Sequence, residues 1–215
     1  MSAELLAVCR VHALLPDAST VGVTAIDKRA VTGPVPVHVL GLGADIQADR
    51  RNHGGEDQAL YAYSQEDADY WSAELGQDIP PGRFGENLRT AGVQTTGAVI
   101  GERWQIGSTV VVEVTSPRVP CATFQRRMQQ PRWVKRFTDA ARVGTYLRVL
   151  VKGSIEAGND ITVLHRPSHG ITVGGYFSRQ APEDVRSLTR LHEAGELRLA
   201  EAYWANFDRI LRREA

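Results

Sequence analysis

Short runs of alternating apolar and polar residues, separated by glycine and other turn residues, dominate the first 165 residues of the chain. The runs lie at residues 4–15, 35–42, 58–64, 98–116, 144–153 and 159–167. Gly107 and Ser108 divide the run at 98–116 into two strands. Short strands punctuated by glycine favour a closed barrel or a sandwich over a wound parallel sheet. The pattern therefore predicts a mainly β fold.

Helical patterns interrupt these strands in two places. Ser64 precedes residues 65–75 and Asp67 follows three positions after it, an arrangement that resembles a capping box with aspartate in place of glutamate. A second helical pattern covers about residues 122–138 and is broken at Pro131, because proline disrupts the interior of a helix. We therefore expect short helices beside the strands.

The C-terminal part of the chain changes to helical spacing. Pro182 opens one helix and Gly195 closes it. The next helix carries an apolar stripe formed by Tyr203, Phe207, Ile210 and Leu211. Such a stripe is usually core, and we interpret it that way. The sequence thus predicts a β domain, a barrel or a sandwich, over residues 1–168 and a small helical appendage over residues 169–215.

Composition narrows the class of protein. The chain has 215 residues and 42% of them are apolar, enough for one domain, or one domain plus a small appendage. Its 25 basic and 25 acidic residues balance, which argues against a broad basic face for nucleic acid. The chain has no apolar run of about 18 residues and its start lacks signal-peptide features, so we expect no membrane span and a cytoplasmic location.

The stretch TSPRVPCATFQRR, residues 115–127, contains the most specific chemistry of the chain. Pro117 and Pro120 stiffen the approach to Cys121, and Arg118 lies three residues before the thiol. The thiolate form of cysteine is the nucleophile and the metal ligand, and a nearby positive charge favours it. A soft thiolate also suits a transition metal. Cys121 is therefore the leading candidate for a reactive or metal-binding residue.

The chain has two cysteines, too few for a disulfide framework, and their surroundings differ. Cys9 lies inside an apolar strand, where a cysteine is most often a small buried hydrophobic residue. For Cys121 a zinc site is not expected, because no second cysteine lies nearby and no spacing pairs two histidines with it. A cysteine–histidine hydrolase with His53 as the base stays open.

Two glycine-rich loops carry further candidates. His53 precedes two glycines, which let the backbone approach a ligand closely, although an exposed turn histidine explains the pattern as well. The loop at residues 80–92 combines Arg83, Glu86 and Asn87. Loops of this kind often bind ligands. Alternatively, Glu86 and Asn87 brace the turn through backbone amides.

A third loop enters the strand at residues 144–153. Arg142 precedes this strand and Thr145 lies at its start. A guanidinium beside a hydroxyl suits a phosphate or another small anion. The alternative is an arginine at a strand edge in solvent, and this alternative fits Arg148 better than Arg142.

In this order, the blocks of the chain resemble the MOSC family, which is named for the C-terminal domain of molybdenum-cofactor sulfurase. The resemblance rests on HGGEDQALYAYSQED at 53–67, PGRFGENL at 81–88, IGERWQIGSTVVVEVTSPRVPC at 100–121 and GTYLRVL at 144–150. The tail, with YWANFDRIL at 203–211, is similar to the appendage of stand-alone bacterial members of the YiiM type. The resemblance covers nearly the whole chain, and the ordered set is more specific than any single block.

This resemblance implies a MOSC-type β-barrel with short helices and a molybdenum–pterin cofactor whose metal is held by Cys121. It also implies reduction of small N-hydroxylated compounds. The residues expected to complete the cofactor pocket are His53, Arg83, Glu86, Asn87, Arg118, Arg142 and Thr145. The alternatives are a cofactor or sulfur carrier without turnover and a metal-free thiol hydrolase.

The partners expected for such a reductase are external electron-transfer proteins. The chain has no flavin or dinucleotide fingerprint and no set of cysteines for an iron–sulfur cluster. Electrons would therefore come from another protein. The helical tail could also build the face of a homodimer.

Overall fold

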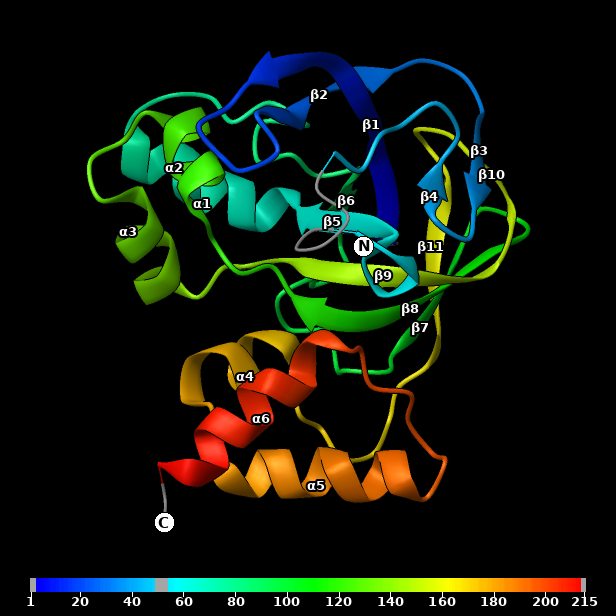
Figure 1. Ribbon diagram of the computed structural model, residues 1–215. Helices are drawn as coiled ribbons and strands as arrows, with labels where there is room; N and C mark the ends of the chain where they lie inside the picture. The colour runs from blue at the N-terminus through cyan, green and yellow to red at the C-terminus, as the bar shows by residue number, and fades with distance from the viewer. Residues whose placement is uncertain (1–2, 49–53, 214–215) are drawn as a thin grey trace.

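The computed structural model of the chain describes residues 3–48 and 54–213. Seven strands close into a barrel in the order β11–β7–β8–β9–β5–β6–β1, and a pairing between β1 and β11 completes the ring (Figure 1). The ring consists of β1 (Ala3–Pro16), β5 (Leu60–Ser64), β6 (Leu88–Ala91), β7 (Arg103–Ile106), β8 (Val110–Pro117), β9 (Thr145–Val151) and β11 (Asp160–His165). Within the ring β5 and β6 run parallel and the other neighbours run antiparallel. The predicted mainly β barrel is therefore confirmed.

Further strands lie beside this ring. β2 (Val23–Val31) pairs antiparallel with β1 from Val8 to Pro16. A small second sheet contains β3 (Val35–His38), β4 (Gly41–Leu42) and β10 (Gly153–Ile155). The run at residues 35–42 was expected to be one strand, but a turn splits it into β3 and β4. The hydrophobic pattern missed β2, because Asp27 and Lys28 interrupt its apolar alternation.

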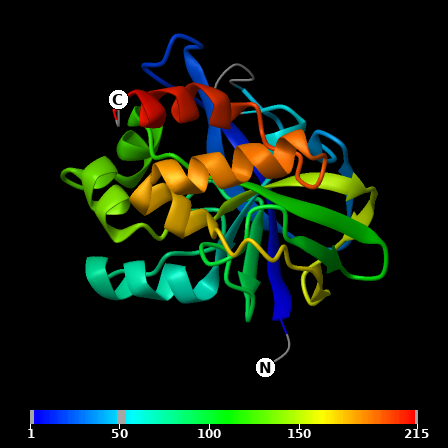
Figure 2. The same cartoon turned by 90° about the horizontal axis from the view of Figure 1, so that it is seen from below.

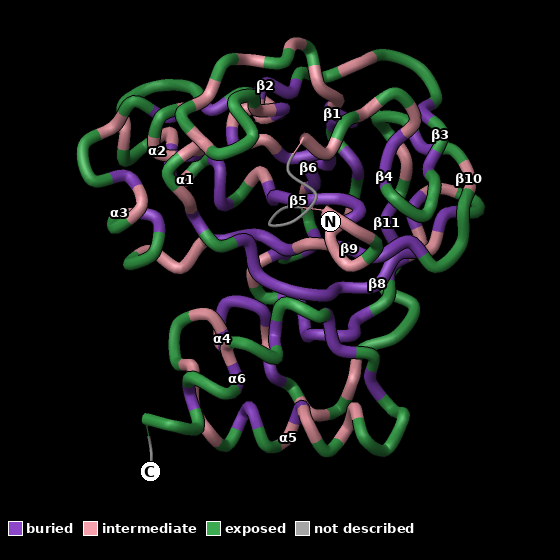
Figure 3. The backbone as a smooth tube through the Cα atoms, viewed as in Figure 1, coloured by how far each residue is buried: buried purple, intermediate pink, exposed green. Residues whose placement is uncertain are grey.

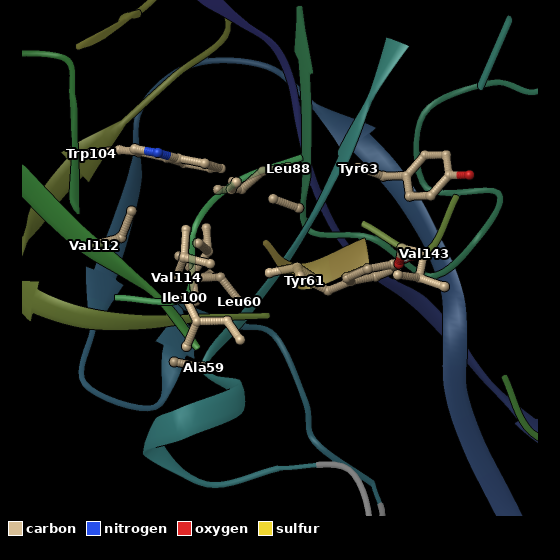
Figure 4. Close-up of a cluster of buried hydrophobic side chains, with 14 of the residues drawn as sticks. Ala59, Leu60, Tyr61, Tyr63, Leu88, Ile100, Trp104, Val112, Val114 and Val143 are labelled. Carbon is tan, nitrogen blue, oxygen red and sulfur yellow. Dashed lines mark hydrogen bonds between the residues drawn. The ribbon is translucent and has the colours of Figure 1, made fainter. Parts of the chain in front are cut away.

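Side chains fill the interior of the barrel, as expected for a small closed barrel. Leu60, Leu88, Trp104, Val112 and Val114 are each at most 1% exposed. Figure 4 shows them gathered from neighbouring strands into one cluster. Within the ring, β5, β6 and β8 are largely buried, whereas β11 is mostly exposed (Figure 3). Each fully buried aliphatic or aromatic side chain stabilises the fold by about 1.5–3 kcal/mol relative to exposure.

A short 3₁₀ turn, η1 (Glu56–Gln58), precedes β5. Three helices connect strands of the ring: α1 (Gln65–Leu75) follows β5, and α2 (Ala122–Met128) and α3 (Trp133–Ala140) lie between β8 and β9. The capping prediction is confirmed, because Ser64 Oγ accepts a hydrogen bond from Asp67 N at 3.3 Å. The predicted break at Pro131 is confirmed as well, because α2 ends before it and α3 begins after it. An aromatic cluster of Trp71, Phe84, Phe124, Trp133 and Phe137 packs these helices together.

The C-terminal helices are α4 (Val173–Arg179), α5 (Pro182–Glu193) and α6 (Ala202–Arg212). They lie together across one side of the barrel, below β7 and β8 in Figure 1 and in front in Figure 2. The predicted start of a helix at Pro182 is confirmed, and Gly195 follows its end with φ 73°. Tyr203 Oη donates a hydrogen bond to the carbonyl oxygen of Thr115 on β8 at 2.9 Å. The division of the chain at residue 168 stays a prediction.

Val185, Leu188, Tyr203 and Phe207 belong to the same buried apolar cluster as the barrel strands. The predicted apolar stripe of α6 is therefore core at three of its positions, whereas Leu211 is 36% exposed. None of the helices in the described residues is long and apolar enough to cross a membrane.

Candidate functional site

A cavity of about 370 Å³ opens between β2, the start of α2 and the ends of β5, β8 and β9. Its wall combines the turn between β1 and β2, the segment after β4, and residues that directly follow β8. The polar and aromatic side chains of the wall include Asp17, Lys28, Asp45, Gln58, Tyr61, Asn87, Arg118, Cys121, Thr123, Arg126 and Tyr146. Segments far apart in the chain thus meet at one concave surface, the usual form of a ligand site.

Cys121 is half-buried in the wall of this cavity, at the position that caps α2. Its backbone is extended, with φ −131° and ψ 174°, and its carbonyl oxygen accepts the first helical hydrogen bond from Gln125 N at 3.0 Å. Pro117 pairs with Thr145 on β9 and so ends β8 in a fixed place. The loop to the thiol is three residues long and contains Pro120, whose φ is fixed by its ring. The barrel therefore positions the sulfur at the cavity through a short, stiff connection.

Arg118 is buried beside this thiol. Its Nη1 donates a hydrogen bond to the carbonyl oxygen of Phe84 at 2.7 Å, and its guanidinium carbon lies 3.8 Å from the ring centroid of Phe124. Burial acts to lower the pKa of Arg118, but the Coulombic effects of nearby groups, Tyr61 and Cys121 among them, raise it above its ordinary value. The cavity wall therefore carries a permanent positive charge next to Cys121.

A second cation, Lys28, lies in the wall with its partner Asp45. Lys28 Nζ forms an ion pair with Asp45 Oδ2, and both side chains are at most 10% exposed. Asp45 also accepts hydrogen bonds from Val11 N and from Asn87 Nδ2, each at 2.8 Å. Asn87 Oδ1 in turn accepts a hydrogen bond from Tyr61 N at 3.2 Å. This chain of hydrogen bonds ties β2, β1 and β5 together along the cavity.

Two tyrosines form the apolar part of the wall. The ring centroids of Tyr61 and Tyr146 are 5.4 Å apart, and Tyr61 Oη donates a hydrogen bond to the carbonyl oxygen of Val143 at 3.0 Å. Burial raises the pKa of Tyr61 and of Tyr146, so both phenols stay neutral at ordinary pH. Their rings give a planar molecule an apolar surface beside the two cations.

An ion pair closes one side of the cavity. Asp17, in the turn between β1 and β2, accepts hydrogen bonds from Arg126 Nε and Arg126 Nη2 at 2.8 Å each. Asp17 also accepts one from Thr123 Oγ1 at 2.9 Å. Arg126 and Thr123 both lie on α2, close to Cys121 in the chain. The contact therefore anchors the β1–β2 turn to the helix that begins at the thiol.

Three of the residues predicted for the site meet in the cavity wall: Cys121, Arg118 and Asn87. Asn87 also braces backbone groups, as the alternative interpretation expected, since it contacts Tyr61 N and the carbonyl oxygen of Cys9. His53 lies outside the described residues.

The other four predicted residues lie outside the cavity wall. Glu86 is fully buried and accepts hydrogen bonds from the backbone N–H groups of Gly82 at 2.8 Å and Phe84 at 3.0 Å, so it braces its loop. Thr145 is fully buried, and its hydroxyl donates to the carbonyl oxygen of Tyr146 at 3.0 Å. The hydrogen bonds of Glu86 and Thr145 to backbone groups therefore stabilise the fold.

Arg142 and Arg83, unlike Arg118, lie outside the cavity wall. Arg142 pairs with Asp67 at 2.7 Å and lies over the ring of Tyr70, with its guanidinium carbon 4.3 Å from the centroid. Arg83 is half-buried, and burial followed by the nearby charge of Arg127 lowers its pKa. Arg142 is thus held by a carboxylate in the fold, and neither arginine reaches the cavity wall.

Sequence reasoning missed Lys28, Asp45, Tyr61 and Tyr146 as members of the site. A signal existed for Lys28, because it follows Asp27 in the middle of the otherwise apolar segment VTAIDKRAV. A charged residue inside an apolar strand needs a partner or a function. No comparable signal marks Tyr61 and Tyr146, which look like ordinary strand aromatics. Within residues 3–48 and 54–213, no three His, Cys, Asp or Glu side chains gather into a protein-only metal centre.

Comparison with known proteins identifies the family. The model of the MOSC domain matches residues 49–162, more than half of the chain. YflK of Bacillus subtilis, an uncharacterized protein, is 31% identical over 193 residues, which cover 87% of this chain and 86% of YflK. Protein YiiM of Escherichia coli is 30% identical over 149 residues, 67% of this chain and 66% of YiiM. A protein named reductase from Gibberella moniliformis is 34% identical over 147 residues, but these cover 26% of its own length.

Solved structures agree in fold. The crystal structure of YiiM from Geobacillus stearothermophilus has a TM-score of 0.76 at 24% identity, covering 97% of this chain and 99% of that one. YiiM from Escherichia coli has a TM-score of 0.71 at 22% identity, covering 97% and 93%. These likenesses show a shared fold. Together with the domain match and the sequence relatives, they confirm the resemblance seen in the sequence, and the chain belongs to the MOSC domain family.

Proposed function

We propose that this protein binds a molybdenum–pterin cofactor through Cys121 and reduces small N-hydroxylated compounds with electrons from external redox proteins. The observation that carries the proposal is the position of the Cys121 sulfur in the wall of a cavity of about 370 Å³ beside the buried cation Arg118. A thiolate suits a soft transition metal. A guanidinium suits an anionic group such as a phosphate. The metal and the anionic group of the cofactor would therefore both find a suitable side chain in one cavity.

A test of fit against the cavity wall supports this proposal. Gln58 Oε1 is buried in that wall and accepts no hydrogen bond from the described residues. A buried acceptor without a donor usually indicates a ligand or water that supplies one. A pterin carries N–H groups that can donate to such an oxygen. The rings of Tyr61 and Tyr146 offer it an apolar surface.

The chain's own residues would bind and orient the reactants. Reduction of a hydroxylamine, R–NH–OH, to an amine and water consumes two electrons and two protons and breaks the N–O bond. The cofactor, when bound, supplies the electron transfer. Arg118 would hold an anionic group, Cys121 would contribute its sulfur to the metal, and the tyrosine rings would exclude water from one side. The likeness to a protein named reductase supports an oxidoreductase class for this chain.

Single-turnover reduction tests this function. Purified, metal-loaded protein is mixed with a hydroxylamine, an amidoxime or an N-hydroxylated base and an artificial low-potential electron donor. We expect substrate loss, followed by chromatography, in proportion to the molybdenum content. Nicotinamide cofactors alone should give no reaction, because the sequence contains no dinucleotide-binding fingerprint.

The same experiment separates a reductase from a carrier. A sulfur carrier would accumulate a persulfide on Cys121, visible by mass spectrometry, and would leave the substrate untouched with any donor. Persulfide without substrate loss at full metal loading would contradict the reductase and support the carrier.

Replacing Arg118 and Arg142 with alanine should have different effects on cofactor retention. Arg118 faces the cavity, whereas Arg142 is engaged with Asp67 outside it. Loss of a charge-assisted contact costs about 1.5–3 kcal/mol, which is about one to two orders of magnitude in affinity. In dialysis we expect Arg118→Ala to bind the cofactor about one to two orders of magnitude more weakly than the wild type. Arg142→Ala should match the wild type. Equal retention by both variants would remove Arg118 from the binding site.

A further inference from the structure

Lys28 is a buried cation in the wall of the cavity. The chain has three lysines, at positions 28, 135 and 152. The side chain of Lys135 is 68% exposed and Lys152 is exposed, whereas the side chain of Lys28 is 10% exposed. A buried ammonium needs a partner to offset its lost hydration. Lys28 has that partner, yet it is placed at a ligand cavity and not within the apolar core.

Asp45 holds the ammonium in a fixed position. The Asp45 carboxylate accepts hydrogen bonds from Val11 N, Asn87 Nδ2 and Lys28 Nζ. Two of these donors belong to the framework of the barrel, so the carboxylate cannot turn away with the lysine. An ammonium has three N–H groups, and Asp45 is the acceptor that the described residues offer it. Two N–H groups are then left for a molecule in the cavity.

The surroundings of Lys28 favour release of its proton. Burial lowers the pKa of Lys28, and Asp45 is the main opposing influence. The other titratable groups that face it are Cys9 on β1 and Glu86 in the loop before β6, and both also oppose the shift. The net direction of the shift in the pKa of Lys28 is downward.

Three other titratable groups of the cavity wall shift in the opposite direction. Burial raises the pKa of Tyr61 and of Tyr146. For Arg118, burial is outweighed by its neighbours, and the pKa rises. These three groups hold their protons more tightly than usual. Efficient general acids have a pKa near the working pH, so Lys28 is better suited than they are.

We propose that Lys28 is a catalytic proton donor, whose Nζ delivers a proton to the hydroxyl oxygen that leaves when the N–O bond breaks. This inference rests on the proposed reductase function. The external donor supplies two electrons, the oxygen departs as water with the Lys28 proton, and the nitrogen takes its second proton from solvent. The neutral amine of Lys28 then regains a proton from solvent at the open side of the cavity. The carboxylate of Asp45 keeps Nζ in place throughout.

Lys28→Arg tests the proposal while keeping the positive charge. Arginine can pair with Asp45 but does not release a proton at accessible pH. We expect its kcat for a hydroxylamine to fall by roughly 10²–10⁴-fold, with molybdenum content and melting temperature unchanged. Lys135→Arg is the matched control, because Lys135 is exposed on α3, and it should behave as the wild type. A Lys28→Arg enzyme with wild-type kcat would overturn the proposal.

The leaving group gives a readout that a purely structural lysine would not move. An O-acylated hydroxylamine loses a carboxylate, which departs as an anion and needs no proton. Lys28→Arg should therefore lose much less activity on this substrate than on the free hydroxylamine. Equal losses on both substrates would mean that Lys28 supports the cavity and does not donate the proton.

A measurement independent of turnover uses the small number of lysines. Protein labelled with ¹⁵N-lysine has three Nζ signals, and Lys28→Arg identifies the one from Lys28. An unreactive O-methyl hydroxylamine should shift the Lys28 signal and leave those of Lys135 and Lys152 in place. Wild-type kcat/KM should decline as pH rises through the midpoint of the Lys28 titration, since the protonated form is the donor. An unmoved Lys28 signal at saturating analogue, or a decline at a different pH, would contradict the proposal.

Failure of this inference is distinguishable from failure of the proposed function. If metal-loaded wild type reduces no N-hydroxylated compound, the function itself is wrong and the role of Lys28 in it is lost as well. If the wild type is active and Lys28→Arg is equally active, the reductase stands and the proton comes from another group.

Discussion

Cys121→Ser is expected to fold normally, to contain no molybdenum and to lose reductase activity down to background. Serine offers a hard hydroxyl in place of a soft thiolate, so it removes the proposed protein ligand of the metal. The fold should tolerate the change well, because Cys121 occupies the capping position of α2. Serine is among the preferred residues there and can add up to about 1 kcal/mol of stability. Metal content and melting temperature of the same preparation separate loss of the ligand from loss of structure.

Cys9→Ser is the matched control for this experiment. Cys9 is fully buried in β1, and burial raises the pKa of its thiol to about 12, so it is neutral and unreactive. Burying a polar serine hydroxyl at this apolar position should destabilise the protein by about 1–3 kcal/mol. Molybdenum and activity should remain. Full activity of Cys121→Ser, or loss of the metal in Cys9→Ser, would be incompatible with the assignment of the two thiols.

Arg89→Met should destabilise the protein by about 3–5 kcal/mol, because it leaves the buried carboxylate of Glu86 without its cation. Glu86 and Arg89 are both 0% exposed and joined through Arg89 Nη2 and Glu86 Oε1 at 2.5 Å. Arg89 also donates hydrogen bonds to the carbonyl oxygens of Ile79 at 3.1 Å and Pro80 at 3.3 Å. Domains are typically stable by about 5–15 kcal/mol, so the change removes a large share of that free energy.

Denaturant unfolding measures this loss, with Lys135→Met as its control. Lys135 pairs with Asp139 on the surface of α3, and both side chains are more than half exposed. Such a pair contributes at most about 1 kcal/mol. A large drop in the free energy of unfolding for Arg89→Met and little change for Lys135→Met is the expected result. Similar small effects for both variants would mean that the buried pair does not hold the loop.

Local patterns predicted the parts of the fold that depend on neighbours in the chain. Ser64 and Asp67 predicted the start of α1, and Pro182 predicted the start of α5. The ordered blocks identified the family and therefore the barrel. They also pointed to Cys121 and Arg118. The nearness of the two side chains required the loop to fold back, and in the structure the charge of Arg118 acts on Cys121.

The parts that sequence could not predict depend on contacts between distant segments. Glu86 and Arg142 were expected at the cofactor, but the fold gives Glu86 the backbone N–H groups of its own loop and pairs Arg142 with Asp67. Conversely, Lys28 and Asp45 form their ion pair only because the fold brings β2 and the segment after β4 together. A single sequence contains the charges but not the pairing between them.

Elemental analysis tests most directly whether this chain binds a molybdenum cofactor. The protein is purified from a host that makes the cofactor, and molybdenum is counted per chain. We expect close to one molybdenum atom per chain, released together with a pterin when the protein is unfolded. A well-folded protein without molybdenum, from a host whose own molybdenum enzymes are loaded, would contradict this expectation.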